Sequence, residues 1–293
     1  MRKTGGHSNL VRAYHQALQA AKSAKDINAE IAAYGKVIEL GQNSTGNEED
    51  IVDKKSLILY WSYNNIGDAL TRKNQSKIIF NKNNYNLALD YYQQAYKLAR
   101  DNAEKIAVLK RMAYNYRLMK DDEAFYKCFL KIIELSQDKD KREAYVALAE
   151  MQKNADEAAA LYERALEYVP KEDTDVAGKC LNTLQICREL LVLYQELDIP
   201  QQQKRIYDLM NKTAVLAVRS LEDKIDGEDN RIRKLELFAK LIEVNRNYLQ
   251  ADDNRCGCLY RRMNDLLKSG EEFEFGGIKY SKNIIRRMLT PLH

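Results

Sequence analysis

Apolar residues recur every three or four positions along most of this chain, which is the spacing of residues on one face of an α-helix. Two consecutive segments show the pattern clearly: Cys180, Leu184, Cys187, Leu191 and Tyr194, followed by Ile206, Leu209, Met210, Thr213, Leu216 and Ala217. The 293 residues include only 12 glycines and 3 prolines, so the chain lacks the turn residues that hairpins, barrels and long loops require. The pattern predicts an all-α protein of about twelve helices joined by short turns.

Several helix ends can be assigned from capping residues. Asn154 and Glu157 have the spacing of a capping box, in which each side chain bonds a backbone N–H of the first turn. Asp121 is suited to cap the helix that follows it, and Pro200 to stand at a first helical position. Pro170 is suited to end the helix before it.

Two stretches depart from the helical pattern. Residues 41–55 are polar and acidic, and we expect them to form a loop. Residues 270–280 carry apolar residues on both sides of Gly276-Gly277, which predicts a small β-hairpin near the C-terminus. A short helix over residues 281–289 is expected to follow it.

The composition favours a folded protein that does not enter a membrane. Hydrophobic residues make up 45% and charged residues 31%, and 47 basic against 43 acidic residues leave a formal charge of only +4. No run approaches the ~18 apolar residues of a membrane-spanning helix, and the basic start of the chain is not followed by the apolar run of a secretory signal. An odd count of five cysteines fits reduced thiols, so we expect a cytoplasmic protein.

A short pattern of small and aromatic residues recurs along the chain. Its copies are Ala158-x3-Tyr162-x2-Ala165, Ala88-x3-Tyr92-x2-Ala95 and Phe125-x3-Phe129-x2-Ile132. The central aromatics of these copies are 37 and 33 residues apart. A second pattern precedes two of them, as Tyr63-x2-Ile66-Gly67-x2-Leu70 and Met112-Ala113-x2-Tyr116. The small residue, Gly67 or Ala113, would let a paired helix approach closely, and an aromatic would fill the space above it.

These two patterns resemble the second and first helices of the tetratricopeptide repeat, whose period is about 34 residues. The resemblance implies a right-handed α-α superhelix, or solenoid, of antiparallel helical hairpins. We expect this array to span residues 1–270, with the best repeats over 57–170 and longer helices over 175–268, and residues 271–293 to cap it. The resemblance also implies a non-enzymatic scaffold or adaptor that binds a protein or peptide on its concave surface.

The resemblance further implies a set of groove residues. In such arrays the first helices line the concave surface, and residues around the small position face it, which here are Asn64, Asn65, Lys110, Arg111 and Tyr114. An asparagine amide can pair with a peptide backbone and an arginine with a carboxylate, so an acidic segment is among the expected partners. Family members that grip the C-terminal carboxylate of chaperones use a further Lys and Asn, where this chain offers His15 and Gln19.

No motif for catalysis, a cofactor or a metal stands out. Histidine is present only at positions 7, 15 and 293, and there is no Walker loop, no His-Glu-x-x-His and no Gly-x-Gly-x-x-Gly. Cys256-Gly-Cys258 is a short spacing without a histidine nearby, whereas structural zinc needs four ligands. We therefore expect neither enzymatic activity nor a bound cofactor or metal.

Three alternatives stay open from the sequence. The first is a regulatory or effector protein, either peptide-sensing or associated with nucleic acid through its basic end, since residues 255–293 hold eight Lys and Arg against four Asp and Glu. No recognised nucleic-acid module is present, so a protein partner is favoured. The second is an enzyme that uses carboxylates or Cys258, and the third is a homo-oligomer assembled through the C-terminal end.

Overall fold

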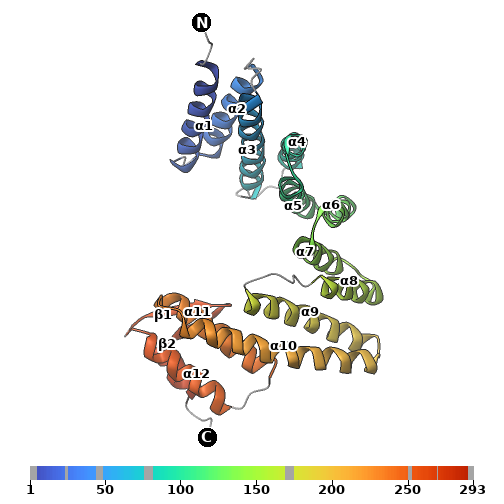
Figure 1. The fold of residues 1–293 in the computed structure, drawn as a ribbon, viewed down its shortest axis with the longest axis vertical. Helices are drawn as coiled ribbons and strands as arrows, with labels where there is room; N and C mark the ends of the chain where they lie inside the picture. The colour runs from blue at the N-terminus through green and yellow to red at the C-terminus, as the bar shows by residue number, and fades with distance from the viewer. Residues whose placement is uncertain are drawn as a thin grey trace. The chain divides into compact units, whose positions relative to one another are not determined.

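The computed structural model describes residues 5–23, 26–43, 49–75, 82–168, 175–249, 253–268 and 270–289. Within these ranges the chain forms thirteen α-helices and one two-stranded β-hairpin (Figure 1). The chain divides into two compact units, residues 1–148 and 149–293, and each is described by itself. The prediction of an all-α chain with one hairpin near its C-terminus is confirmed.

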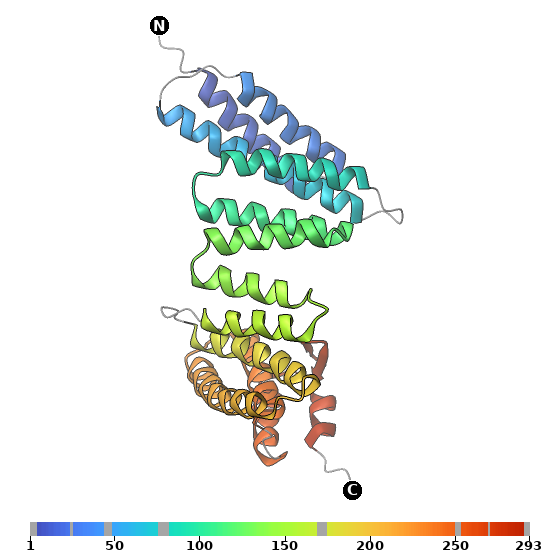
Figure 2. The same cartoon turned by 90° about the vertical axis from the view of Figure 1, so that its right-hand side faces the viewer.

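The first unit is a stack of helices in chain order (Figure 2). Its helices are α1 (Gly5–Ser23), α2 (Ile27–Asn43), α3 (Glu49–Gln75), α4 (Lys82–Leu98), α5 (Asn102–Met119), α6 (Asp122–Leu135) and α7 (Asp138–Ala149), the last of which reaches the boundary of the unit. From α1 to α6 each helix packs on the next, and the first helices of neighbouring pairs also touch, α1 with α3 and α3 with α5. These are the contacts of stacked helical hairpins whose first helices share one layer.

The predicted loop over residues 41–55 is wrong at both of its ends. Helix α2 continues to Asn43 and α3 begins at Glu49, while residues 44–48 lie outside the described part of the chain. Acidic residues at the start of a helix are stabilised by the partial positive charge of its first N–H groups. An acidic stretch is therefore compatible with a helix that begins at Glu49 and Asp50.

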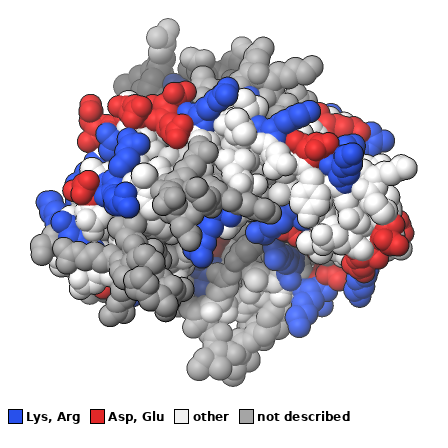
Figure 3. Space-filling view, turned by 90° about the horizontal axis from the view of Figure 1, so that it is seen from below, with Lys and Arg blue, Asp and Glu red and all other residues white. Residues whose placement is uncertain are grey.

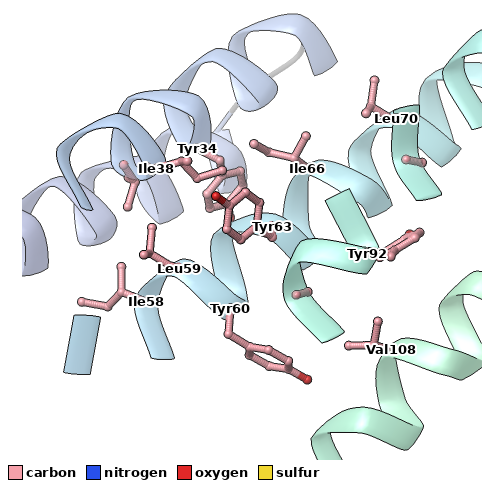
Figure 4. Packing of buried hydrophobic residues seen from close by; sticks show 14 residues of the cluster. Tyr34, Ile38, Ile58, Leu59, Tyr60, Tyr63, Ile66, Leu70, Tyr92 and Val108 are labelled. Carbon is pink, nitrogen blue, oxygen red and sulfur yellow. The ribbon is translucent and has the colours of Figure 1, made fainter. Parts of the chain in front are cut away.

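Buried tyrosines from α2, α3 and α4 organise the core of the first unit. Tyr34, Tyr60 and Tyr92 are almost fully buried and belong to one cluster with aliphatic side chains such as Ile66 (Figure 4). The closest approach occurs at Gly67, where an added Cβ would lie 2.5 Å from Cε1 of Tyr92. The expectation that Gly67 lets a paired helix approach closely beneath an aromatic is therefore confirmed.

We expect Gly67→Ala to destabilise the protein by about 1–3 kcal/mol, although alanine is the better helix former. The new methyl would meet the buried Tyr92 ring, whose hydroxyl is held by a hydrogen bond to Asp68, so the ring cannot move aside cheaply. The matched control is Gly35→Ala in α2, where nothing lies within 4 Å of the new Cβ and stability should rise by up to about 1 kcal/mol. Urea unfolding followed by circular dichroism measures both, and a stabilised Gly67→Ala variant would contradict the packing described here.

The second unit contains longer helices and the hairpin. Its helices are α8 (Ala155–Glu167), α9 (Val176–Glu196), α10 (Pro200–Asp226), α11 (Arg231–Asn247), α12 (Asp253–Leu266) and α13 (Lys282–Leu289). Each of α9 to α12 packs on the helix that precedes it. The predicted apolar face of α9, from Cys180 to Tyr194, is buried throughout, whereas Leu216 of α10 is 52% exposed. The prediction that Leu216 belongs to the buried face of α10 is therefore wrong. Its side chain points well away from the buried residues Thr213 and Ala217 of that face.

The predicted helix ends are confirmed where the structure describes them. Asn154 and Asp121 each accept a hydrogen bond from the backbone N–H three residues further on, at 3.1 Å. Pro200 is the first residue of α10. Pro170 lies outside the described residues. The capping signals therefore placed the starts of α6, α8 and α10 correctly.

The C-terminal hairpin has the predicted position and turn. Strands β1 (Glu272–Phe275) and β2 (Ile278–Ser281) are antiparallel, with Phe273 opposite Tyr280. Gly276 and Gly277 form the turn with φ angles of 58° and 76°, a conformation that residues with a side chain rarely adopt. Helix α13 follows directly and packs on α12 and β2, so the predicted final helix is confirmed.

An ion pair joins the start of α11 to the residue before β1. Arg231 donates from Nη1 and Nη2 to the two carboxylate oxygens of Glu271, at 2.6 and 2.8 Å. The backbone N–H of Lys268 donates to the same carboxylate at 2.8 Å. These hydrogen bonds favour the charged form of Glu271 and lower its pKa to about 2. The bonds from Arg231 have the largest effect, followed by the bond from Lys268.

The stability that this ion pair contributes should decrease as the pH is lowered. The pKa of Glu271 falls from 4.5 to about 2 on folding, so the stabilisation is present above about pH 4.5 and is lost as the pH falls through about 2. We expect the difference in Tm between the wild-type protein and Glu271→Gln to stay constant from about pH 7 to 5 and to shrink at lower pH. Differential scanning calorimetry measures this difference, and an equal gap at about pH 7 and 2.5 would show that the contact does not form in solution.

Candidate functional site

Helices α3 and α5 lie parallel and are joined along their length by hydrogen bonds. Four residues of α3 bond residues of α5 that follow them by 44, 43, 44 and 39 positions: Tyr60 with Glu104, Asp68 with Arg111, Thr71 with Asn115, and Gln75 with Tyr114. Three of the four offsets are 43 or 44, which means that the two helices run in the same direction and in register. Their neighbouring surfaces therefore form one continuous face.

The solvent side of this pair carries two large aromatic side chains among polar ones. We call it the α3–α5 face and define it by Trp61, Asn65, Asp68, Arg72 and Gln75 of α3 with Lys110, Arg111 and Tyr114 of α5. The α3 members are spaced by four, three, four and three residues, which places them on one side of the helix. Trp61, the single tryptophan of the chain, is 41% exposed and Tyr114 is 48% exposed.

The two predicted asparagines have different environments. Asn65 lies on the α3–α5 face, partly exposed, and makes no side-chain hydrogen bond within the described residues. Asn64 is 1% exposed, donates from Nδ2 to the Tyr60 carbonyl at 2.9 Å, and leaves Oδ1 without a partner among the described residues. Its assignment as a groove residue is therefore wrong, because it follows Tyr60 by one helical turn and shares the buried side of α3.

Arg111 is already bound to a carboxylate of the same unit. Its Nε lies 3.2 and 3.3 Å from the two carboxylate oxygens of Asp68, and its Nη1 donates to the Ala107 carbonyl at 3.2 Å. Asp68 also accepts a hydrogen bond from the Tyr92 hydroxyl at 2.8 Å. The arginine is thus held in place by α3, by α4 acting through Asp68, and by its own helix.

Lys110 is also paired. Its Nζ lies 2.7 Å from a carboxylate oxygen of Asp140 and 2.7 Å from one of Glu143, both on α7. Partial burial alone would lower the pKa of Lys110, but these two carboxylates outweigh that effect and raise it. The cations on which an acidic partner was predicted therefore have carboxylate partners within the chain itself.

A buried polar contact beneath the face was not predicted from the sequence. The Thr71 hydroxyl lies 2.9 Å from both Oδ1 of Asn115 and the Gly67 carbonyl oxygen, and either can accept its hydrogen. The Asn115 amide donates to the Arg111 carbonyl at 3.0 Å. Both side chains are buried. A usable signal was present for Thr71, because it is a polar residue one turn after the predicted packing position Gly67, on the side of the helix otherwise occupied by apolar residues.

We expect Thr71→Val to lower the free energy of unfolding by about 1–3 kcal/mol, because it leaves the buried Asn115 oxygen without a donor. The control is Ser62→Ala in the same helix. Among the described residues, the buried Ser62 hydroxyl bonds only the Ile58 carbonyl of its own helix, so its loss should cost less than about 1 kcal/mol. Thermal unfolding of both variants provides the comparison, and equal losses would mean that the Thr71–Asn115 bond adds nothing between the helices.

The other residues considered from the sequence differ in their exposure. His15 and Gln19 are exposed on α1, Cys256 is buried and Cys258 is exposed. Among the described residues no group of three metal-ligating side chains occurs, and no described helix is long and apolar enough to cross a membrane. On the face seen in Figure 3, basic and acidic side chains are interspersed and not gathered into one basic patch.

Comparison with known proteins gives structural similarity only. No family model matches the chain, and no curated protein matches it. Among solved structures, BtubC (BKLC) from P. vanneervenii is 14% identical over 76% of this chain and 92% of its own, with a TM-score of 0.40. A tetratricopeptide repeat protein from Parabacteroides merdae is 13% identical over 97% of both chains, with a TM-score of 0.39. The stacking of helical hairpins in the first unit follows from the contacts between its own helices.

Proposed function

We propose that this protein is a non-enzymatic scaffold that binds a peptide or protein segment on the α3–α5 face. One observation carries the proposal: two large aromatic side chains, Trp61 and Tyr114, are exposed on a face that hydrogen bonds hold in register. Single exposed apolar residues are common on protein surfaces, but aromatic side chains that share one ordered face are the usual anchors of protein interfaces.

Asn65 supports the same proposal. Its amide carries both a donor and an acceptor, and neither is used by a described residue. An extended segment that crosses the first helices has unpaired backbone N–H and C=O groups that need such partners. Asn65 lies one turn from Trp61 on α3, so one segment can reach both side chains.

The rigidity of the face also favours binding. Hydrogen bonds between α3 and α5, together with the ion pairs of Lys110 and Arg111, fix the relative position of the contact residues before a partner arrives. Preorganisation of this kind lowers the entropy lost on binding. Stacked helical hairpins provide an extended surface for such contacts because each hairpin packs only on its neighbours.

Two further expectations from the sequence stay predictions: that residues 271–293 cap the helical array, and that the protein is located in the cytoplasm. A regulatory role and assembly of several copies are compatible with a peptide-binding face. No specific contact among the described residues favours either of them.

The proposal is tested with peptides selected on the 293-residue chain from a random dodecapeptide phage library. We expect Trp61→Ala and Tyr114→Ala each to weaken binding of a selected peptide at least about tenfold, as loss of an aromatic anchor does. Fluorescence anisotropy of the labelled peptide measures affinity, and circular dichroism checks that the fold is kept.

The matched controls are Leu87→Ala on α4 and Leu130→Ala on α6, which remove apolar side chains of similar exposure from second helices. They should leave the affinity unchanged. If no selected peptide depends on Trp61 or Tyr114, the α3–α5 face is not the binding surface and the proposal fails.

A further inference from the structure

The charges beside the α3–α5 face specify the kind of segment it can accept. Building on the proposed function, we propose that the occupant is an extended segment with an Arg or Lys side chain close to an aromatic or aliphatic one, and not an acidic segment. The basic side chain would bind the carboxylates of Asp140 and Glu143, and the apolar one would pack on Trp61 or Tyr114.

The cations of this region are committed to carboxylates of the chain. Lys110 bonds Asp140 and Glu143, and Arg111 bonds Asp68 and a backbone carbonyl. A carboxylate of a bound segment would have to displace these partners from Lys110 or Arg111. It would then lie close to the carboxylates of Asp68, Asp140 and Glu143. Like charges brought together in this way oppose binding, so an acidic segment is disfavoured.

The carboxylates keep unused acceptor capacity. Lys110 bonds one oxygen of Asp140 and one of Glu143, and no other described residue bonds either carboxylate. Their side chains are 36% and 45% exposed. A carboxylate offers about four acceptor positions, so a guanidinium or ammonium group can bind here without breaking an existing contact.

The ion-paired side chains of the cluster carry one net negative charge, since two cations, Lys110 and Arg111, face three carboxylates, Asp68, Asp140 and Glu143. Outside this paired set, α7 also carries Lys139, Lys141 and Arg142 beside the two carboxylates in the chain. Arg117 lies about two turns beyond Lys110, so it stands further along α5 than the cluster. Apart from Lys110 and Arg111, no described Lys or Arg of α5 forms an ion pair with these carboxylates.

The test uses the same dodecapeptide selection on the 293-residue chain and determines the amino-acid composition of the bound peptides. We expect peptides whose binding depends on Trp61 or Tyr114 to be enriched in Arg or Lys near an apolar residue. In one such peptide, replacing the basic residue with Glu should weaken binding at least about tenfold, since it exchanges attraction for repulsion.

A variant of the protein tests the assigned carboxylates. Asp140→Asn together with Glu143→Gln should remove most of the preference for the basic peptide over its Glu version and should release Lys110 for acidic peptides. The matched control is Asp122→Asn with Glu123→Gln on α6, which changes the net charge equally and should leave the preference intact. Circular dichroism verifies that both double variants fold.

The two proposals fail in different ways. Trp61-dependent peptides that are acidic, or that show no charge preference, would overturn the inference about the segment and leave the binding function standing. A preference for basic peptides that survives Asp140→Asn with Glu143→Gln would also overturn it. Absence of any Trp61- or Tyr114-dependent peptide would instead remove the proposed function itself.

Discussion

The approach of Tyr92 to Gly67 is the contact on which the first unit depends. Because Gly67 has no side chain, the Tyr92 ring of α4 can lie directly against α3, where an added Cβ would be only 2.5 Å from it. That position brings the tyrosine hydroxyl to Asp68. Asp68 in turn binds Arg111 of α5. One missing methyl group thus allows the packing of two helices and the placement of an arginine on a third.

The polar contacts around the α3–α5 face position side chains more than they stabilise the fold. Exposed ion pairs contribute little, about 0–1 kcal/mol each, so the pairs of Lys110 and Arg111 are not a major source of stability. Their effect is geometric and electrostatic, since they hold two cations to three carboxylates and leave Trp61 and Tyr114 exposed nearby. Stability comes from the buried tyrosine cluster and from buried bonds such as Thr71–Asn115.

Prediction from the sequence succeeded where local spacing decides the structure. Helical periodicity, capping residues such as Asn154 and the Gly276-Gly277 turn identified elements that the structure contains. Prediction from the sequence failed where two neighbouring residues differ only in the direction in which their side chains point. Asn64 and Asn65 are adjacent and chemically identical, yet one is buried and the other lies on the α3–α5 face, because successive residues of a helix point about 100° apart.

The sequence by itself determined that this chain forms paired helices with a C-terminal hairpin, since periodicity, capping and turn residues act over a few positions. It also located Gly67 as a packing residue and placed Lys110, Arg111 and Tyr114 near a shared surface. Only the tertiary structure decided the charge of that surface. The carboxylates that bind Arg111 and Lys110 come from helices about 30 to 43 positions away, and such pairings depend on helix register, which local sequence does not encode.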